Sequence, residues 1–166
     1  MVASRVRPSF LILLSAAMLS IPTFATEPTP RQLSQFTVRD PTRGIEWLRC
    51  AAGQTWNGTT CAGEPRLFSY EEATRAAALA SDELGGRWRL PNREELESLL
   101  CVPCGIPQID TRTFPHTPAA SFWSSTTSWY SSTQHWSVNF RSGVASGRNP
   151  PGMRHHVRLV RDAPLK

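Results

Sequence analysis

Residues 85–100 have the sequence GGRWRLPNREELESLL, which predicts the end of one helix, an extended segment and the start of a second helix. The two leading glycines end a preceding helix, because glycine adopts the left-handed cap conformation without steric cost. Pro91 disfavours helical backbone at the residue before it, so the segment leading to Pro91 is expected to be extended. Asn92 and Glu95 have the spacing of a capping box, in which each side chain bonds the other's backbone N–H at the start of a helix. The apolar face of this second helix would consist of Leu96, Leu99 and Leu100.

A similar start signal precedes the glycines. Ser69 and Glu72 form another capping box, and apolar residues then follow at spacings of three and four, which predicts a helix with one buried face. That face consists of Tyr70, Ala73, Ala77, Ala80 and Leu84. Strands are expected on both sides of the helices, from β-rich composition and from alternation of apolar and polar residues. The expected strands are residues 36–38, 45–48, 122–126, 135–141 and 154–161. The order of elements predicts an α+β fold.

The four cysteines are expected to form two disulfides. Cys50 and Cys61 flank the turn signal Asn-Gly, and a hairpin there would bring the two sulfurs together. Cys101 and Cys104 form the second expected pair, and the other two connectivities remain alternatives. A reactive CxxC pair normally begins a helix, where the helix dipole stabilises the thiolate. Cys101 and Cys104 instead follow the second helix, so a structural disulfide is favoured over a thiol redox function.

The first 25 residues have the features of a signal peptide. Arg5 and Arg7 precede an apolar segment at residues 10–21, and the sequence TFA ends at Ala25. The apolar segment is too short to span a bilayer, so we expect an exported protein, periplasmic or extracellular, with no membrane span. Export also makes a nucleic-acid partner improbable despite the formal net charge of +5. The expected organisation is a signal peptide at 1–25, a flexible leader at 26–35 and one domain at 36–162.

Several motifs occur in the order of one known family. The motifs are WLRCAAGQTWNGTTCAG, GGRWRLPNREELESLL, PQIDTRTFP, FWSST, HWSVNFRSG and VRLVR. Together they resemble the C-terminal domain of Legionella collagen-like proteins over residues 36–162. The resemblance implies a C-type-lectin-like fold, in which two helices pack on a small, twisted, mostly antiparallel sheet. It also implies an extracytoplasmic location, and some members of the family resemble adhesins that bind sulfated glycans.

Residues that would support catalysis or metal binding are sparse. Of the four histidines, the adjacent His155 and His156 would point to opposite faces of a strand and so would not share a metal ion. The C-terminal half lacks an Asp-rich loop of the kind that binds calcium, and its serines lack a nucleophile motif. We therefore expect a protein without catalytic residues, metal or cofactor.

A binding surface is the remaining expectation. Trp129 and Tyr130 lie in an uncharged, hydroxyl-rich segment that also contains His135, a composition typical of adaptable recognition surfaces. An arginine-rich stretch follows, and the planar guanidinium group suits sulfate or carboxylate. The candidate ligand-binding residues are Trp129, Tyr130, His135, Arg141, Arg148 and Arg154. The expected ligand is an acidic or sulfated glycan, the alternative is a protein of the envelope, and a solvated surface without a ligand remains a third possibility. Neither the ligand nor the oligomeric state follows from the sequence.

Overall fold

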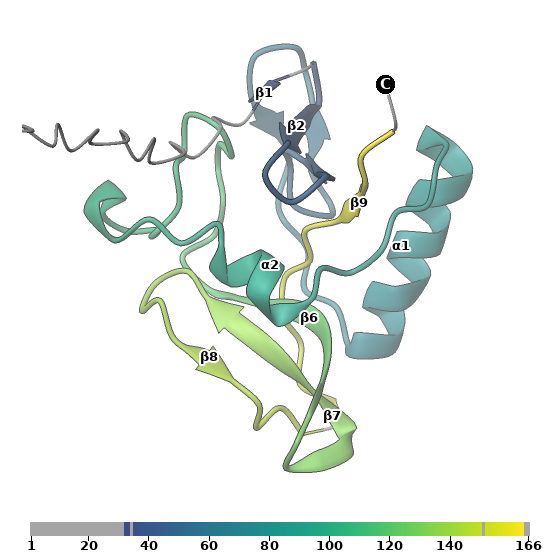
Figure 1. Ribbon diagram of the computed structural model, residues 1–166, viewed down its shortest axis with the longest axis vertical. Helices are drawn as coiled ribbons and strands as arrows, with labels where there is room; N and C mark the ends of the chain where they lie inside the picture. Colours follow the sequence, from purple (N-terminus) through teal and green to yellow (C-terminus); the bar gives the residue numbers. More distant parts are fainter. Residues whose placement is uncertain (1–31, 34, 151, 165–166) are drawn as a thin grey trace, which may run out of the picture.

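A computed structural model describes residues 32–33, 35–150 and 152–164 (Figure 1). The expected signal peptide at 1–25 lies outside these residues, as do residues 26–31 and 34 of the expected leader. Within the leader range, Gln32–Leu33 (β1) pairs with the next strand. The described chain is a mixed fold of two α-helices and short antiparallel sheets, stapled by two disulfides.

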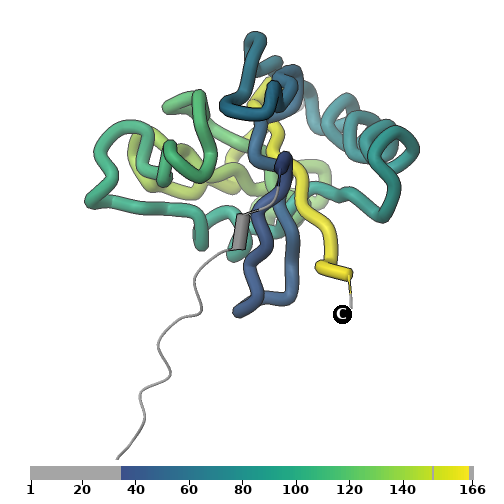
Figure 2. Tube along the Cα trace, turned by 90° about the horizontal axis from the view of Figure 1, so that it is seen from above, coloured from purple at the N-terminus to yellow at the C-terminus, as the bar shows by residue number. Residues whose placement is uncertain are grey.

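One sheet joins the two ends of the described chain. Its strand order is β1-β2-β3-β9, and every neighbouring pair is antiparallel. Figure 2 shows the C-terminal segment running beside the N-terminal hairpin. The other three strands of this sheet are β2 (Thr37–Asp40), β3 (Ile45–Leu48) and β9 (Val160–Asp162). A separate two-stranded ladder, β4 (Thr55–Trp56) and β5 (Cys61–Ala62), follows β3.

The second main sheet is built on a long hairpin. Its strands are β6 (Ser121–Ser128), β7 (Ser131–Asn139) and β8 (Ala145–Ser146). The alternation predicted for residues 135–141 is confirmed in its inner part, because Trp136, Val138 and Phe140 are all buried. Register shifts between Trp123 and Ser128 interrupt the ladder toward the hairpin turn.

Both predicted capping boxes are formed. Ser69 caps α1 (Tyr70–Leu84) and Asn92 caps α2 (Arg93–Glu97). The second helix is shorter than its leucines suggested, because it ends at the cap residue Ser98 and Leu99 is buried from the following turn. The first helix buries Ala73 and Ala77, whereas Leu84, expected on the same face, is exposed.

The segment before β9 lies at the centre of the fold. It differs in this from the strand predicted for residues 154–161, in which apolar and polar residues would occupy opposite faces. Only its end is a strand (β9), and all residues from 156 to 160 are buried. Backbone hydrogen bonds connect this segment to both sides: Trp123 donates to His156, and Ala52 donates to Val157. Because it contacts elements on every side, neither face is left for solvent.

Arg158 is a fully buried cation in that central segment. Its guanidinium donates to the carbonyl oxygens of Leu48, at 3.0 Å, and Arg49, and to the hydroxyl of Thr117, at 2.7 Å. It also lies 4.7 Å from the centre of the Phe114 ring. Burial lowers the pKa of Arg158 to about 9, so the group still carries its charge at neutral pH. Two successive carbonyls at the end of β3 and one hydroxyl from the loop before β6 thus converge on one side chain.

Replacing Arg158 by alanine is expected to lower the free energy of unfolding by about 3 kcal/mol or more. The substitution removes packing volume and leaves three buried acceptors without their donor. Urea unfolding measures the difference. Arg148→Ala, which truncates an exposed arginine, is the control and should change stability by less than about 0.5 kcal/mol. Equal effects of the two substitutions would contradict a structural role for Arg158.

Candidate functional site

The turn of the β6–β7 hairpin presents two aromatic rings to solvent. Trp129 is 72% exposed and Tyr130 is 54% exposed, and they occupy the two positions between the paired residues Ser128 and Ser131. The Ser128 hydroxyl accepts a hydrogen bond from the backbone N–H of Tyr130, which fixes the turn locally. Two large exposed rings at the tip of a supported hairpin are available for contact with a ligand.

A buried tryptophan supports the exposed one. The Trp129 ring meets the Trp136 ring edge to face, with 4.6 Å between centroids. The backbone of Gly147 lies against the Trp136 ring. A Cβ at position 147 would stand 3.0 Å from two carbons of that ring and 2.9 Å from the Ser128 hydroxyl. The close passage at Gly147 therefore holds Trp136, and through it Trp129, in place.

Two arginines complete the surface. The Arg93 guanidinium lies 4.2 Å from the centre of the Trp136 ring and 6.0 Å from that of Trp129. The Arg148 guanidinium lies 4.8 Å from the centre of the Tyr130 ring. Within the described residues Arg148 has no carboxylate partner. We call this group the hairpin-tip cluster, which consists of Arg93, Trp129, Tyr130, Trp136 and Arg148.

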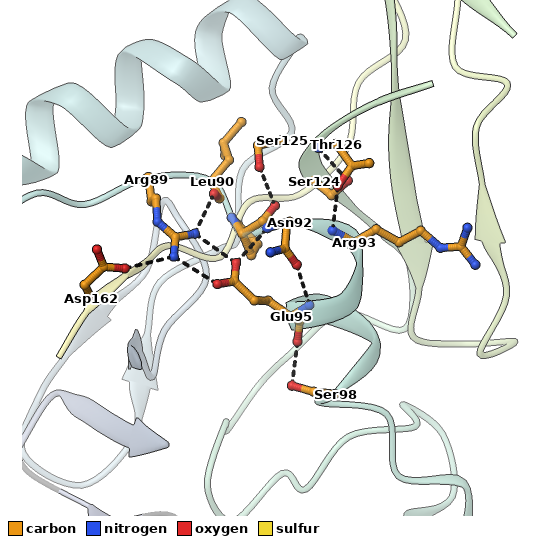
Figure 3. A network of polar contacts seen from close by, with 11 residues as sticks. Arg89, Leu90, Asn92, Arg93, Glu95, Ser98, Ser124, Ser125, Thr126 and Asp162 are labelled. Atoms are coloured by element: carbon orange, nitrogen blue, oxygen red, sulfur yellow. Dashed lines mark hydrogen bonds and ion pairs between the residues drawn. The ribbon is translucent and has the colours of Figure 1, made fainter. Parts of the chain in front are cut away.

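The first turn of α2 positions Arg93 (Figure 3). The backbone N–H of Arg93 donates to the Thr126 hydroxyl on β6 at 2.9 Å. Its side chain forms an ion pair with Glu97 one turn later at 2.7 Å, so the guanidinium is already bonded on one side. The helix start is thereby fixed to the hairpin that it supports.

Glu95 in turn fixes the helix start. One carboxylate oxygen accepts from the backbone N–H of Asn92 at 2.7 Å, and both oxygens accept from the guanidinium of Arg89 at 2.8 and 2.9 Å. Arg89 also contacts Asp162 at 3.2 Å. In Figure 3 the Arg89 guanidinium lies between two carboxylates, that of Glu95 on α2 and that of Asp162 on the C-terminal strand.

The predicted ligand-binding residues are only partly brought together. Trp129, Tyr130 and Arg148 lie in one cluster. Arg141 is exposed but lies past the opposite end of β7, roughly 25 Å from the tip by strand length. Arg154 forms an ion pair with Glu72 at 2.7 Å and donates to the carbonyl of Leu67, so it faces the start of α1.

His135 is half-buried against α1 rather than exposed at the tip. Its ring stacks on Tyr70 with 3.4 Å between centroids, and its buried Nδ1 has no partner among the described residues. Burial lowers the pKa of His135. The side chain therefore joins the hairpin to α1 as a neutral, packed ring.

Neither Arg93 nor Trp136 was among the predicted ligand-binding residues. Trp136 was correctly expected to be buried, and the alternation gives no sign that its ring supports an exposed neighbour. Arg93 follows the capping residue Asn92 directly, so the capping box predicted its place at the helix start. Its proximity to the hairpin depends on a contact 33 residues away, which no local pattern indicates.

Both expected disulfides are present. Cys50 pairs with Cys61 and Cys101 pairs with Cys104, so all four cysteines are oxidised. The second pair spans the short helix η1 (Val102–Cys104) that follows α2, as expected for a staple beyond a helix end. The part of the chain that the structure describes contains no group of three metal-ligating side chains. No helix in those same ranges is long and apolar enough to cross a membrane.

Comparison with known families matches the motifs to one domain. The family described as the Lcl C-terminal domain matches residues 36–161. The chain belongs to this family. No curated protein and no solved structure matches the chain. The matched range thus contains both helices, the hairpin-tip cluster and both main sheets apart from β1 and Asp162. The disulfides are compatible with export.

We expect the stability of this Lcl C-terminal domain to fall at mildly acidic pH. Burial lowers the pKa values of His135, His155 and His156 from the ordinary value of 6.5. The unfolded chain therefore binds protons more tightly than the folded protein. Stability is fully present above about pH 6.5 and is lost progressively as the pH falls toward the lowered pKa values.

Urea unfolding at several pH values between 5 and 8 measures this dependence. His135→Phe keeps an aromatic ring against Tyr70 and removes one titrating group, so its stability should fall less steeply with acid than that of the wild type. A wild-type protein that is more stable at pH 5 than at pH 7 would contradict the expectation.

Proposed function

We propose that this protein is a non-enzymatic, exported binding module that holds an acidic or sulfated glycan at the hairpin-tip cluster. The observation that carries the proposal is the Arg148 guanidinium over the Tyr130 ring, beside the exposed Trp129. A sugar ring stacks on an aromatic face, and a sulfate or carboxylate on that sugar bonds to a guanidinium. The cluster offers both contacts side by side, the rings from the hairpin turn and Arg148 from the segment after β8.

The surroundings of the tip suit a carbohydrate. Ser131 and Thr133, which begin β7, contribute hydroxyls that bond each other at 3.0 Å and remain able to bond a ligand. Arg93 adds a second cation behind the tryptophan pair, although Glu97 already balances part of its charge. Aromatic rings therefore supply contact area, and the arginines supply the preference for anions.

The proposal includes the fold expected from the family resemblance. A C-type-lectin-like fold places two helices against a twisted, mostly antiparallel sheet. Two features support it: the strand that ends the domain pairs with a strand from its beginning, and a long antiparallel hairpin forms most of the second main sheet. The binding site is assigned from its own side chains rather than from the fold.

A protein partner in the envelope is the second candidate function. Two exposed apolar side chains in and beside the disulfide loop favour it, namely Val102 at 73% and Ile106 at 66% exposed. This loop lies beyond α2 and contributes nothing to the hairpin-tip cluster. A partner bound there would leave Trp129 and Arg148 unaffected.

Binding of a heparin fragment by the disulfide-bonded protein tests the glycan function. Calorimetry at low and physiological salt should show affinity that falls as salt rises, because exposed charge contacts are screened. Trp129→Ala and Arg148→Ala should each weaken binding about tenfold. Arg141→Ala removes the same charge at a distance from the cluster and serves as the matched control. Absence of binding, or equal losses in Arg148→Ala and Arg141→Ala, would contradict the proposed site.

A further inference from the structure

An apolar groove lies on a different face from the hairpin tip, between α1 and the disulfide-bonded loop 50–61. Its volume is about 770 Å³. The floor contains Leu48, Ala52 and Leu159, which also belong to the core beneath α1 or pack against it. The size and the apolar floor indicate that the groove accommodates a large apolar group.

One wall of the groove is a regular stripe along α1. The stripe has helical spacing and consists of Ala76, Leu79, Ala80, Glu83 and Leu84. Leu79 is 57% exposed and Leu84 is 46% exposed, and Phe36 across the groove is 40% exposed. Contiguous exposed apolar side chains of this kind mark surfaces that a partner covers. The two alanines leave room for another helix to approach closely.

Two opposite charges mark the ends of the groove. Arg66 lies three residues before the cap of α1, and Glu83 is the next-to-last residue of the helix. A helix of 15 residues is roughly 22 Å long, so these charges stand near opposite ends of the stripe. Neither has an ion-pair partner within the described ranges of the chain. The groove is thus apolar along its length, positive at one end and negative at the other.

We infer that a second copy of this chain occupies the groove, with its α1 antiparallel to the first. A two-fold axis then places each Arg66 against the partner's Glu83, so two equivalent ion pairs form across the interface. The exposed leucines of each copy enter the groove of the other. Antiparallel helices also place opposite dipole ends side by side. The exposed side of α1 therefore matches the groove of a second copy in both shape and charge.

This inference goes beyond the proposed function and does not rest on it. A dimer would carry two hairpin-tip clusters, and two linked sites on a repeating polymer such as a glycan raise the overall affinity without any new contact. The dimer and the glycan site involve different residues, so each can fail without the other.

Sedimentation velocity of the disulfide-bonded protein, over about 1 to 100 μM, tests the dimer. The wild type should be a dimer in the upper part of this range, and Leu79→Asp should be a monomer. Arg66→Glu and Glu83→Arg should each weaken association about tenfold, because each places two like-charge pairs across the interface. The double variant Arg66→Glu/Glu83→Arg should restore association, since the reversed charges match again.

Controls separate the interface from general effects of charge and folding. Arg87→Glu makes the same charge change at an exposed position that does not line the groove, and should leave the dimer intact. Circular dichroism checks that every variant is folded. A wild type that stays monomeric at 100 μM overturns the inference, including the case in which the monomer binds an apolar dye in the groove. Charge reversals that the double variant does not rescue also overturn it.

Discussion

The carboxylate of Glu95 is the contact on which the arrangement of this domain depends. It caps the start of α2 by accepting from Asn92, and it holds the guanidinium of Arg89 through two hydrogen bonds. Arg89 is in turn paired by its backbone with Val160 in the C-terminal strand. One buried acid thus joins a helix start, the connection before it and the last strand. The pair is only partly buried, because the Arg89 side chain is 40% exposed, and such a pair fixes geometry more than it adds stability.

The proposed binding surface follows from that constraint. With the start of α2 fixed, the N–H of Arg93 reaches the Thr126 hydroxyl on β6, and its guanidinium lies over Trp136. Trp136 then supports Trp129 at the exposed turn. The aromatic tip is consequently held by a helix as well as by its own hairpin. This rigid support lowers the entropy that a ligand must overcome on binding.

Local sequence patterns correctly predicted the helix caps and the disulfides, which depend on residues close together in the sequence. Both capping boxes formed because Ser69 and Asn92 interact with acids only three positions away. The disulfides formed between cysteines close in sequence. These contacts require little more than a turn or a hairpin.

Long-range contacts account for what the sequence did not predict. Arg158 is buried because the carbonyls of Leu48 and Arg49, far away in the sequence, converge on it, whereas the strand predicted for residues 154–161 gave no sign of such a contact. The C-terminal arginines were expected to act together, but Arg154 is paired with Glu72 across the fold. Leu84 has the spacing of a buried residue and nevertheless stands at the rim of the groove. Spacing along a helix identifies a face, but not what covers that face.

The most direct test of the proposed site is an NMR titration of the indole N–H signals with a heparin fragment. The chain has six tryptophans, and each gives one separate indole signal. We expect saturable shifts of Trp129 and its neighbour Trp136. The signals of the other four should remain in place, namely Trp47, Trp88 and Trp123 in the core and Trp56 in the groove. Shifts confined to Trp56, or saturable binding that leaves Trp129 unchanged, would contradict the proposed site.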